Sequence, residues 1–221
     1  HAPPPPPQPP APSAPPCRVR DPATTVLSFG ADITVKNNNL GGFDPLLPAT
    51  LLYGNVGTVQ ATGQTLDLEV TNTSLYRPWR TIRTGLNGEF AQINLDAPKS
   101  GAGEELNYVT LLMRLLDAST GAPVVLDRFH MSFYDFDEGV DGNGRECFST
   151  RGYTRIQVSE STTQIVDGVD SVDSSFTSFC GSQTGALSDN PTSPFALTEH
   201  QRSKSIEVTY QETSQVEMRF S

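Results

Sequence analysis

Oxygen-bearing side chains gather in the glycine-rich stretch RFHMSFYDFDEGVDGNGRE, residues 128–146. The candidate ligands there are Asp135, Asp137, Glu138, Asp141 and Asn143. Glycines lie between the later ones, and they let a loop fold back so that several oxygens converge on one point. A hard cation such as Ca²⁺ takes about 6–8 oxygen ligands. The pattern therefore predicts a calcium site, although not an EF-hand, and the alternative is an acidic hairpin tip that binds nothing.

Other kinds of active site find little support in the sequence. The histidines are His1, His130 and His200, and there is no Gly-x-Ser-x-Gly nucleophile turn. Asp135 and Asp137 could be the paired carboxylates of a glycoside hydrolase. Two carboxylates so close on one strand face more often share a cation, whereas acid and base groups need separate environments. We therefore expect that the chain is not an enzyme.

The three cysteines, Cys17, Cys147 and Cys180, form no Cys-x-x-Cys motif, and no histidine lies at zinc-ligand spacing from them. Zinc is therefore not expected. We expect a disulfide between Cys147 and Cys180, because it would pin the acidic loop to the later Gly/Ser-rich segment. Pairing of Cys17 with either of the others stays open, and an odd cysteine also suits a partner chain or a free thiol.

A single tryptophan, Trp79, stands among Arg77, Arg80 and Arg83 in the stretch LYRPWRTIRTG. Such a cluster could stack a sugar ring or a partner's aromatic or proline ring. Aromatic-lined grooves also suit polyproline II segments. The alternative is a half-buried tryptophan that covers one end of the fold. We name Trp79, Arg77 and Arg80 as candidate partner-binding residues.

Residues 1–16 read HAPPPPPQPPAPSAPP and contain ten prolines, which excludes a helix or an inner strand. Polyproline II is expected, at about 3.1 Å per residue and so roughly 50 Å long. A stiff segment without hydrogen bonds of its own is expected to dock on a neighbouring copy, and the alternative is a stiff disordered linker. We therefore expect a Pro-rich arm over residues 1–17 and a single β-sandwich domain over residues 18–221.

Alternating apolar and polar residues beyond the arm predict an all-β fold, an antiparallel, jelly-roll-like sandwich of about ten strands. The chain has no long amphipathic helix, and only one helical turn is expected, over residues 198–204. A loop is expected over residues 37–48. The expected strands cover residues 26–29, 51–56, 65–71, 91–95, 106–116, 124–137, 154–158, 164–166, 174–179, 206–210 and 216–220.

The strands over residues 106–116 and 124–137 are expected to pair as one long hairpin, with the acidic loop at its far end. Phe129, Met131 and Phe133 share one face of the second strand. Asp135 and Asp137 continue that face, which is expected to leave the core and enter the charged site.

The net charge of −10, from 25 acidic and 15 basic residues, argues against nucleic acid or an anionic membrane as the main partner. No apolar run approaches the length of about 18 residues that a membrane span needs. The sequence begins at His1, and we expect a processed mature terminus. Asn72, Thr73 and Ser74 form a sequon, so Asn72 is a candidate for N-glycosylation.

The Pro-rich segment, the loop FYDFDEGVDGNGRE followed by Cys147, and the late stretch NPTSPFALTEHQ together resemble extracellular glycoproteins of algae and other protists, of the cell-wall or flagellar-hair (mastigoneme) type. The resemblance implies a secreted structural role and calcium at Asp135, Asp137, Glu138 and Asp141. The Pro-rich segment is shorter than a cell-wall rod. The resemblance also implies hydroxylated and O-glycosylated prolines, for which the candidates are Pro3, Pro4, Pro5, Pro6, Pro7, Pro9 and Pro10.

These features favour a secreted structural glycoprotein subunit that assembles into an extracellular filament or surface coat through its arm. The expected partners are other copies of the chain and attached glycans. The alternative is a calcium-dependent carbohydrate-binding module, in which the loop cation and Trp79 both contact a sugar.

Overall fold

The computed structural model describes residues 25, 27–30, 32–96, 107–138, 144–159, 165–185 and 190–221. The Pro-rich arm and Cys17 lie outside these residues. The described part contains a 3-10 helix, η1 (Thr81–Arg83), and a short α-helix, α1 (Glu199–Ser203). Its strands are β1 (Thr34–Asn38), β2 (Leu51–Thr58), β3 (Thr65–Asn72), β4 (Gly85–Asn87), β5 (Phe90–Gln92), β6 (Val109–Asp117), β7 (Leu126–Phe133), β8 (Cys147–Thr150), β9 (Arg155–Val158), β10 (Ile165–Val169), β11 (Thr177–Gly181), β12 (Ile206–Thr213) and β13 (Gln215–Phe220).

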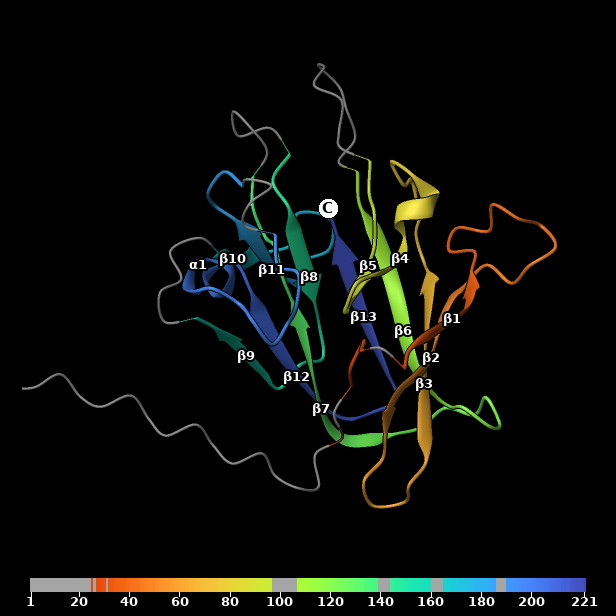
Figure 1. The fold of residues 1–221 in the computed structure, drawn as a ribbon. Coiled ribbons are helices and arrows are strands. Elements are labelled where there is room, and N and C mark those ends of the chain that lie inside the picture. Colours follow the sequence, from red (N-terminus) through yellow and green to blue (C-terminus); the bar gives the residue numbers. More distant parts are fainter. Residues whose placement is uncertain are drawn as a thin grey trace, which may run out of the picture.

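Two antiparallel sheets form the body of the fold (Figure 1). The larger sheet has eight strands in the order β1-β2-β3-β6-β13-β8-β11-β10, and the smaller has the order β7-β12-β9. A separate hairpin joins β4 to β5. The all-β antiparallel prediction is therefore confirmed. No helix among the described residues is long and apolar enough to cross a membrane.

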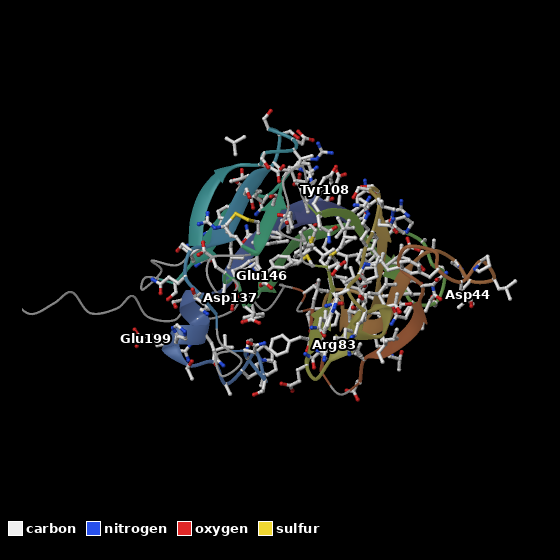
Figure 2. The ribbon with its side chains drawn as sticks, turned by 90° about the horizontal axis from the view of Figure 1, so that it is seen from above. Asp44, Arg83, Tyr108, Asp137, Glu146 and Glu199 are labelled. Carbon is white, nitrogen blue, oxygen red and sulfur yellow. A yellow bond between two sulfur atoms is a disulfide. The ribbon has the colours of Figure 1, made fainter. Side chains whose placement is uncertain are left out.

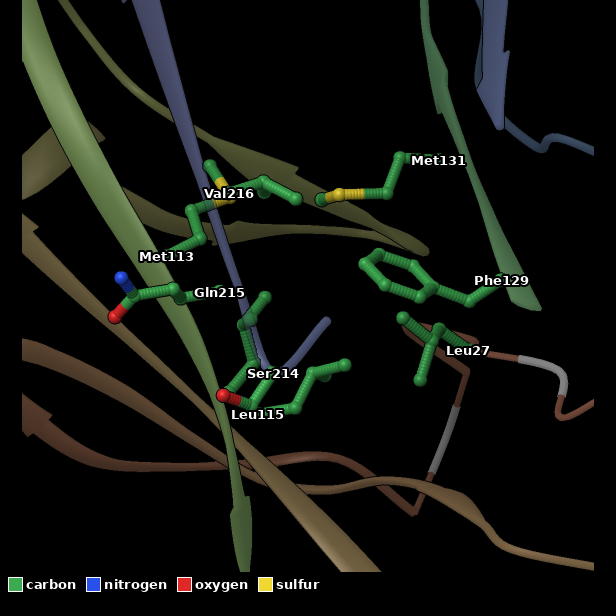
Figure 3. A pocket seen from close by; sticks show the side chains of 9 residues that line it. Leu27, Met113, Leu115, Phe129, Met131, Ser214, Gln215 and Val216 are labelled. Atoms are coloured by element: carbon green, nitrogen blue, oxygen red, sulfur yellow. The ribbon is translucent and has the colours of Figure 1, made fainter. Parts of the chain in front are cut away.

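The hydrophobic core lies where the two sheets face each other, because alternate residues of each strand point inward. Leu111 and Met218 come from the large sheet, and Phe129 and Tyr210 come from the small one; all four are buried. Leu27 helps to close a narrow apolar gap between the sheets that has no room for a water molecule (Figure 3). The interior is therefore packed and offers no internal ligand cavity at this point.

The predicted hairpin of residues 106–116 with 124–137 is wrong. Strand β6 pairs with β3 and β13, whereas β7 pairs with β12 in the other sheet. The last two strands separate in the same way, because β12 and β13 belong to different sheets although only Ser214 lies between them. In both cases the two consecutive strands therefore lie in different sheets and face each other across the core. Periodicity showed which face is apolar but not which strand is the neighbour.

Asp135 ends the alternation that begins in β7. Its backbone has φ 70°, in the left-handed region. This turn brings Phe136, rather than Asp135, into the core, where Phe136 is buried. The prediction that Asp135 and Asp137 extend the apolar strand face is therefore wrong, because one residue of left-handed backbone shifts the order of the faces.

Smaller differences lie at the first sheet edge. Residues 26–29 were predicted as a strand, but within the described residues only an isolated bridge forms there, between Leu27 and Gly57. The edge strand is instead β1, which overlaps the predicted loop at residues 37–48. Strand β1 is polar, and the amide of Asn37 secures it by donating to the Thr50 carbonyl oxygen at 2.7 Å. An exposed, polar edge strand lacks the apolar period that reveals an inner strand.

Candidate functional site

The predicted acidic loop starts where β7 ends, and its described part returns to the edge of the large sheet. The Glu138 N–H donates to the Gln183 carbonyl at 2.9 Å, and the Gly185 N–H donates to the Glu138 carbonyl at 2.9 Å. The Glu146 N–H donates to the Asp137 carbonyl at 2.9 Å. These bonds place Asp135, Asp137 and Glu138 beside the ends of β8 and β11.

Two glycines allow the backbone and side chain of Asp137 to fit against the segment after β11. A Cβ atom on Gly181 would lie 2.6 Å from the Asp137 Cα, which is closer than packed carbon atoms approach. A Cβ atom on Gly185 would overlap the Asp137 carboxylate. Neither glycine has a positive φ, so their role here is to leave space for Asp137.

The counter-charge beside Asp137 is a lysine from a distant part of the chain. Lys204 follows α1, its side chain is 1% exposed, and its Nζ lies 3.5 Å from Asp137 Oδ2. The Phe136 N–H donates to the Lys204 carbonyl at 3.2 Å, which continues the pairing of β7 with β12. We define Asp135, Asp137, Glu146 and Lys204 as the acidic site.

Glu146 is the acidic-site group with an altered proton affinity. Burial by the surrounding protein, and after it the Asp137 and Asp135 carboxylates, raise the pKa of Glu146 to about 8 against the attraction of Lys204. Glu146 as a whole residue is nevertheless exposed. A carboxyl with this pKa is largely protonated at neutral pH and can donate or accept a proton.

Glu138, a predicted calcium ligand, points elsewhere and forms an ion pair with Arg145, with Nη2 and Oε1 2.6 Å apart. Asp141 and Asn143, two other predicted ligands, lie outside the described residues. Within the described residues, no group of three or more His, Cys, Asp or Glu side chains has the geometry to hold a metal ion. Calcium binding by the loop stays a prediction.

A disulfide joins Cys147 to Cys180, the pairing that the sequence analysis expects. The two cysteines face each other in the β8–β11 ladder, directly beside the acidic site. Figure 2 shows Asp137 and Glu146 close to this edge of the molecule, with Asp44 on the opposite side. The bond therefore locks the strand ends that carry the acidic site.

A surface groove lies on that opposite side, where β1 meets η1. Its volume is about 260 Å³. We define the aromatic groove by its lining residues, which are Asn38, Asn39, Leu40, Phe43, Asp44, Tyr76, Thr81 and Thr84. Phe43 is 56% exposed, and its ring centre lies 6.3 Å from that of Tyr76. The groove thus offers the exposed Phe43 ring together with amide and hydroxyl groups, whereas Tyr76 is only 4% exposed.

Hydrogen bonds hold the walls of the aromatic groove in place. The buried Asn39 side chain donates to the Asp44 carbonyl at 2.8 Å and accepts from the Asp44 N–H at 2.9 Å. Asn38 donates to the Thr84 carbonyl at 2.7 Å, and the Tyr76 hydroxyl donates to the Asn94 carbonyl at 2.8 Å. The loop after β1 and the segment around η1 are therefore preorganised.

Trp79 lies two residues before η1 and is 53% exposed. The Arg80 guanidinium carbon lies 4.3 Å from the centre of its ring, and that of Arg83 lies 5.6 Å away. Arg77 is exposed nearby in the chain, and its carbonyl accepts from the Asp96 N–H at 3.0 Å. The two cation–π contacts hold the indole while leaving about half of it open to a partner.

Asn72, the sequon residue, ends β3 on a half-buried surface. Its Oδ1 accepts from the Gly41 N–H at 3.1 Å, and its Nδ2 donates to the Ser74 carbonyl at 2.8 Å. N-glycosylation there stays a prediction.

Sequence reasoning missed the residues that surround Asp137, namely Glu146, Gly181, Gly185 and Lys204. They are distant in the sequence from one another and share no local motif. One signal was present: Lys204 is one of three lysines in the chain and directly precedes an apolar strand. A lysine at such a position is either a satisfied buried charge or a reactive amine.

No protein-family model and no curated protein matches the chain. Among solved structures, it is similar to the N-terminal domain of the Streptococcus gordonii adhesin Sgo0707, with a TM-score of 0.48 and 11% identity over 90% of this chain and 60% of that one. It is also similar to the adhesin domain of PrgB from Enterococcus faecalis, with a TM-score of 0.41 and 10% identity over 78% of this chain and 56% of that one. The chain thus spans less than two thirds of each.

Proposed function

We propose that the chain is a secreted structural unit that joins copies of itself in an extracellular filament or surface coat and is not an enzyme. The Pro-rich segment, residues 1–16, would dock in the aromatic groove of the next copy. The observation that carries this proposal is a preorganised groove that exposes the Phe43 ring, and whose lining residues Tyr76 and Thr81 lie on either side of the half-exposed Trp79 in the sequence.

The chemistry of the groove suits a polyproline II ligand. Proline rings pack well on aromatic faces, and this mode of recognition relies on aromatic-lined grooves. A polyproline II backbone makes no internal hydrogen bonds, so its carbonyl groups need outside donors. Thr81 in the lining is exposed and carries a hydroxyl group that can donate, and the exposed Trp79 carries an indole N–H.

Disulfide formation supports a site of action outside the reducing cytosol, because such bonds persist mainly in oxidising compartments. The hydroxylated prolines, attached glycans and loop calcium that the sequence predicts would belong to the same extracellular setting. They are separate proposals, and the assembly of copies through the groove does not require them.

The calcium-dependent lectin alternative needs the acidic loop and Trp79 to contact one sugar. The strand that leads to Trp79, β3, and the strand that directly follows Glu146, β8, have two strands between them. At about 4.8 Å per strand, this separation is roughly 14 Å. A single sugar ring is much shorter, so this arrangement favours docking of the arm over a shared calcium–sugar site.

The test uses the full chain at rising concentration, with its mass followed by light scattering. A synthetic peptide of residues 1–16 then competes with the arms, and a peptide of equal length with serine in place of proline is the control. We expect the assembled mass to fall toward that of the monomer with the first peptide alone. Assembly that neither peptide affects would contradict the proposal.

A pair of variants then locates the receiving surface. Trp79→Ala is expected to weaken assembly, because it removes the largest exposed ring beside the groove. Phe195→Ala is the control, since Phe195 is 78% exposed in the segment before α1 and does not line the groove. Equal weakening by both variants would exclude the Trp79 surface as the specific acceptor, and sugar-dependent binding with an unchanged monomer mass would favour the lectin reading.

A further inference from the structure

Lys204 and Asp137 form an ion pair whose lysine is buried, unlike that of an adjustable surface ion pair. The pairing of Ile206 with Phe133 aligns β12 with β7, and the segments that carry Lys204 and Asp137 adjoin these two ends. Lys204 Nζ and Asp137 Oδ2 lie 3.5 Å apart, with the lysine 1% and the aspartate 18% exposed. This separation places the Lys204 nitrogen beside the carboxyl group whose carbon it would attack.

The surroundings restrict how far Asp137 can move away. Its carbonyl accepts from the Glu146 N–H, its backbone packs on Gly181, and its carboxylate lies over Gly185. On the core side, Phe136 and Phe148 are buried, with ring centres 6.2 Å apart. The pair therefore lies between a rigid, disulfide-locked strand edge and an apolar core.

We propose that Lys204 and Asp137 condense to form an intramolecular isopeptide bond, an amide between the Lys204 Nζ and the Asp137 Cγ. One proton first passes from the Lys204 ammonium to the Asp137 carboxylate, which burial favours because it removes two charges from a medium of low dielectric constant. The neutral amine attacks Cγ, a C–N bond forms, and a C–O bond breaks. The hydroxyl group leaves with one nitrogen proton as water, and no group is oxidised or reduced.

Glu146 lies next to the pair, because its N–H donates to the Asp137 carbonyl at 2.9 Å. Its carboxyl group would carry the proton in this step. The protonated acid donates its proton to the departing hydroxyl group and takes up the proton that the nitrogen loses. Glu146 returns to its starting state, so the reaction needs no cofactor and consumes only the two side chains.

Two other ion pairs show why the chemistry is specific to Lys204. Arg219 forms a buried pair with Asp170, but a guanidinium keeps its proton and does not act as a neutral nucleophile. Lys36 lies 2.6 Å from Asp67, yet its side chain is 38% exposed, so water stabilises its charged form. Only Lys204 among these combines an amine with burial.

The bond would clamp the chain independently of how copies assemble. It would join the end of β7 to the start of β12, 67 residues further along the chain, across the acidic site. Together with the Cys147–Cys180 disulfide, it would fix both sides of this edge. Failure of arm docking would leave this inference untouched, and the reverse also holds.

The test is intact-mass spectrometry of the full chain, produced in a bacterial host that adds no glycans or hydroxyl groups to proline. The protein is reduced and denatured before measurement. We expect a mass lower than that of the sequence by one water molecule. Trypsin should then leave Lys204 uncut and release residues 129–145 joined to residues 203–219. A full sequence mass, with cleavage after Lys204, would overturn the proposal.

Variants assign the bond to its two partners. Lys204→Arg and Asp137→Ala are expected to restore the full sequence mass, and Lys36→Arg is expected to keep the loss of water. Glu146→Gln should leave part of the chain uncondensed with an unchanged circular dichroism spectrum, and complete condensation in this variant would overturn its role as proton carrier. If Lys204→Arg or Asp137→Ala fails to fold, the joined peptide of the unaltered chain decides the question by itself.

Discussion

The acidic site and the aromatic groove lie on opposite sides of the same β-sandwich and differ in how far their side chains are exposed. At the acidic site, the Lys204 side chain is 1% exposed and Asp137 is enclosed by two glycines and a disulfide-linked strand edge. At the groove, Trp79 is 53% exposed and Leu46 in the adjoining loop is 89% exposed. Charged groups in a glycine-rich loop can therefore serve the fold itself, whereas the surface open to a partner is aromatic.

The largest expected effect comes from filling the space beside Asp137. Gly181→Ala places a methyl group 2.6 Å from the Asp137 Cα, and backbone must move to accommodate it. We expect the free energy of unfolding to fall by about 1–3 kcal/mol, as for other overpacked sites. Chemical denaturation measures this change, and the mass loss of the proposed cross-link should fall with it.

Gly168→Ala is the matched control for that substitution. Gly168 lies in the neighbouring strand β10, and a Cβ atom there would meet nothing within 4 Å. Its effect on unfolding should be less than about 1 kcal/mol. Equal losses from both variants would mean that the contact with Asp137 is not what makes Gly181 necessary.

The second-largest effect is expected on the pH dependence of stability, through Glu146 at the acidic site. The folded-state pKa of Glu146 is raised from 4.5 to about 8, so between these values the folded chain binds more protons than the unfolded chain. Stability from this group is therefore greatest at the acidic end and is lost as the pH rises toward 8. Melting temperatures across this range should fall for the unaltered chain, and Glu146→Gln should reduce that fall. A parallel fall in both proteins would contradict this assignment.

Adding calcium distinguishes the cross-link from a metal site, because an amide at Asp137 and a calcium ion bound by the same carboxylate exclude each other. The cross-linked chain should keep its melting temperature within experimental error when calcium or a chelator is added. A ligand that binds only the folded state must raise stability by mass action. A rise in melting temperature with calcium that Asp137→Ala abolishes would therefore show that the ion binds the Asp137 carboxylate and would contradict an amide there.

The smallest effect on stability is expected from a substitution at Trp79, on the side of the molecule that carries the aromatic groove. Trp79→Ala removes a half-exposed ring that contacts Arg80 and Arg83, so unfolding should change by no more than about 1 kcal/mol. Its effect should instead be on assembly. A large loss of stability would show that Trp79 supports the fold. The two sides of the molecule would then not differ in this respect.

Sequence reasoning recovered the parts of this molecule that leave a local pattern. Alternating apolar residues predicted β3, β6 and β12, and a Thr198 cap with Gln201 three residues later accompanies the predicted helical turn. The same patterns could not predict that β6 and β7 lie in different sheets, because alternation defines a face and not a neighbour. Partner choice depends on contacts between segments distant in the sequence.

The residues of the candidate sites also fall into those with a recognisable signal in the sequence and those without one. Cys147, Cys180 and Trp79 could be selected by residue type alone. Lys204 could not be paired with Asp137 beforehand, since 67 residues separate them and the left-handed turn at Asp135 redirects the loop. The groove depends on Asn39, whose buried amide orders a loop of irregular sequence.

The most direct test of assembly through the groove uses the single tryptophan as its reporter. Trp79 emission would be recorded for the diluted full chain while a peptide of residues 1–16, which contains no tryptophan, is added. Docking predicts a saturable change in the intensity or wavelength of emission, and the peptide with serine in place of proline should produce none. An emission spectrum that stays constant up to peptide concentrations that dissociate the assembly would contradict docking beside Trp79.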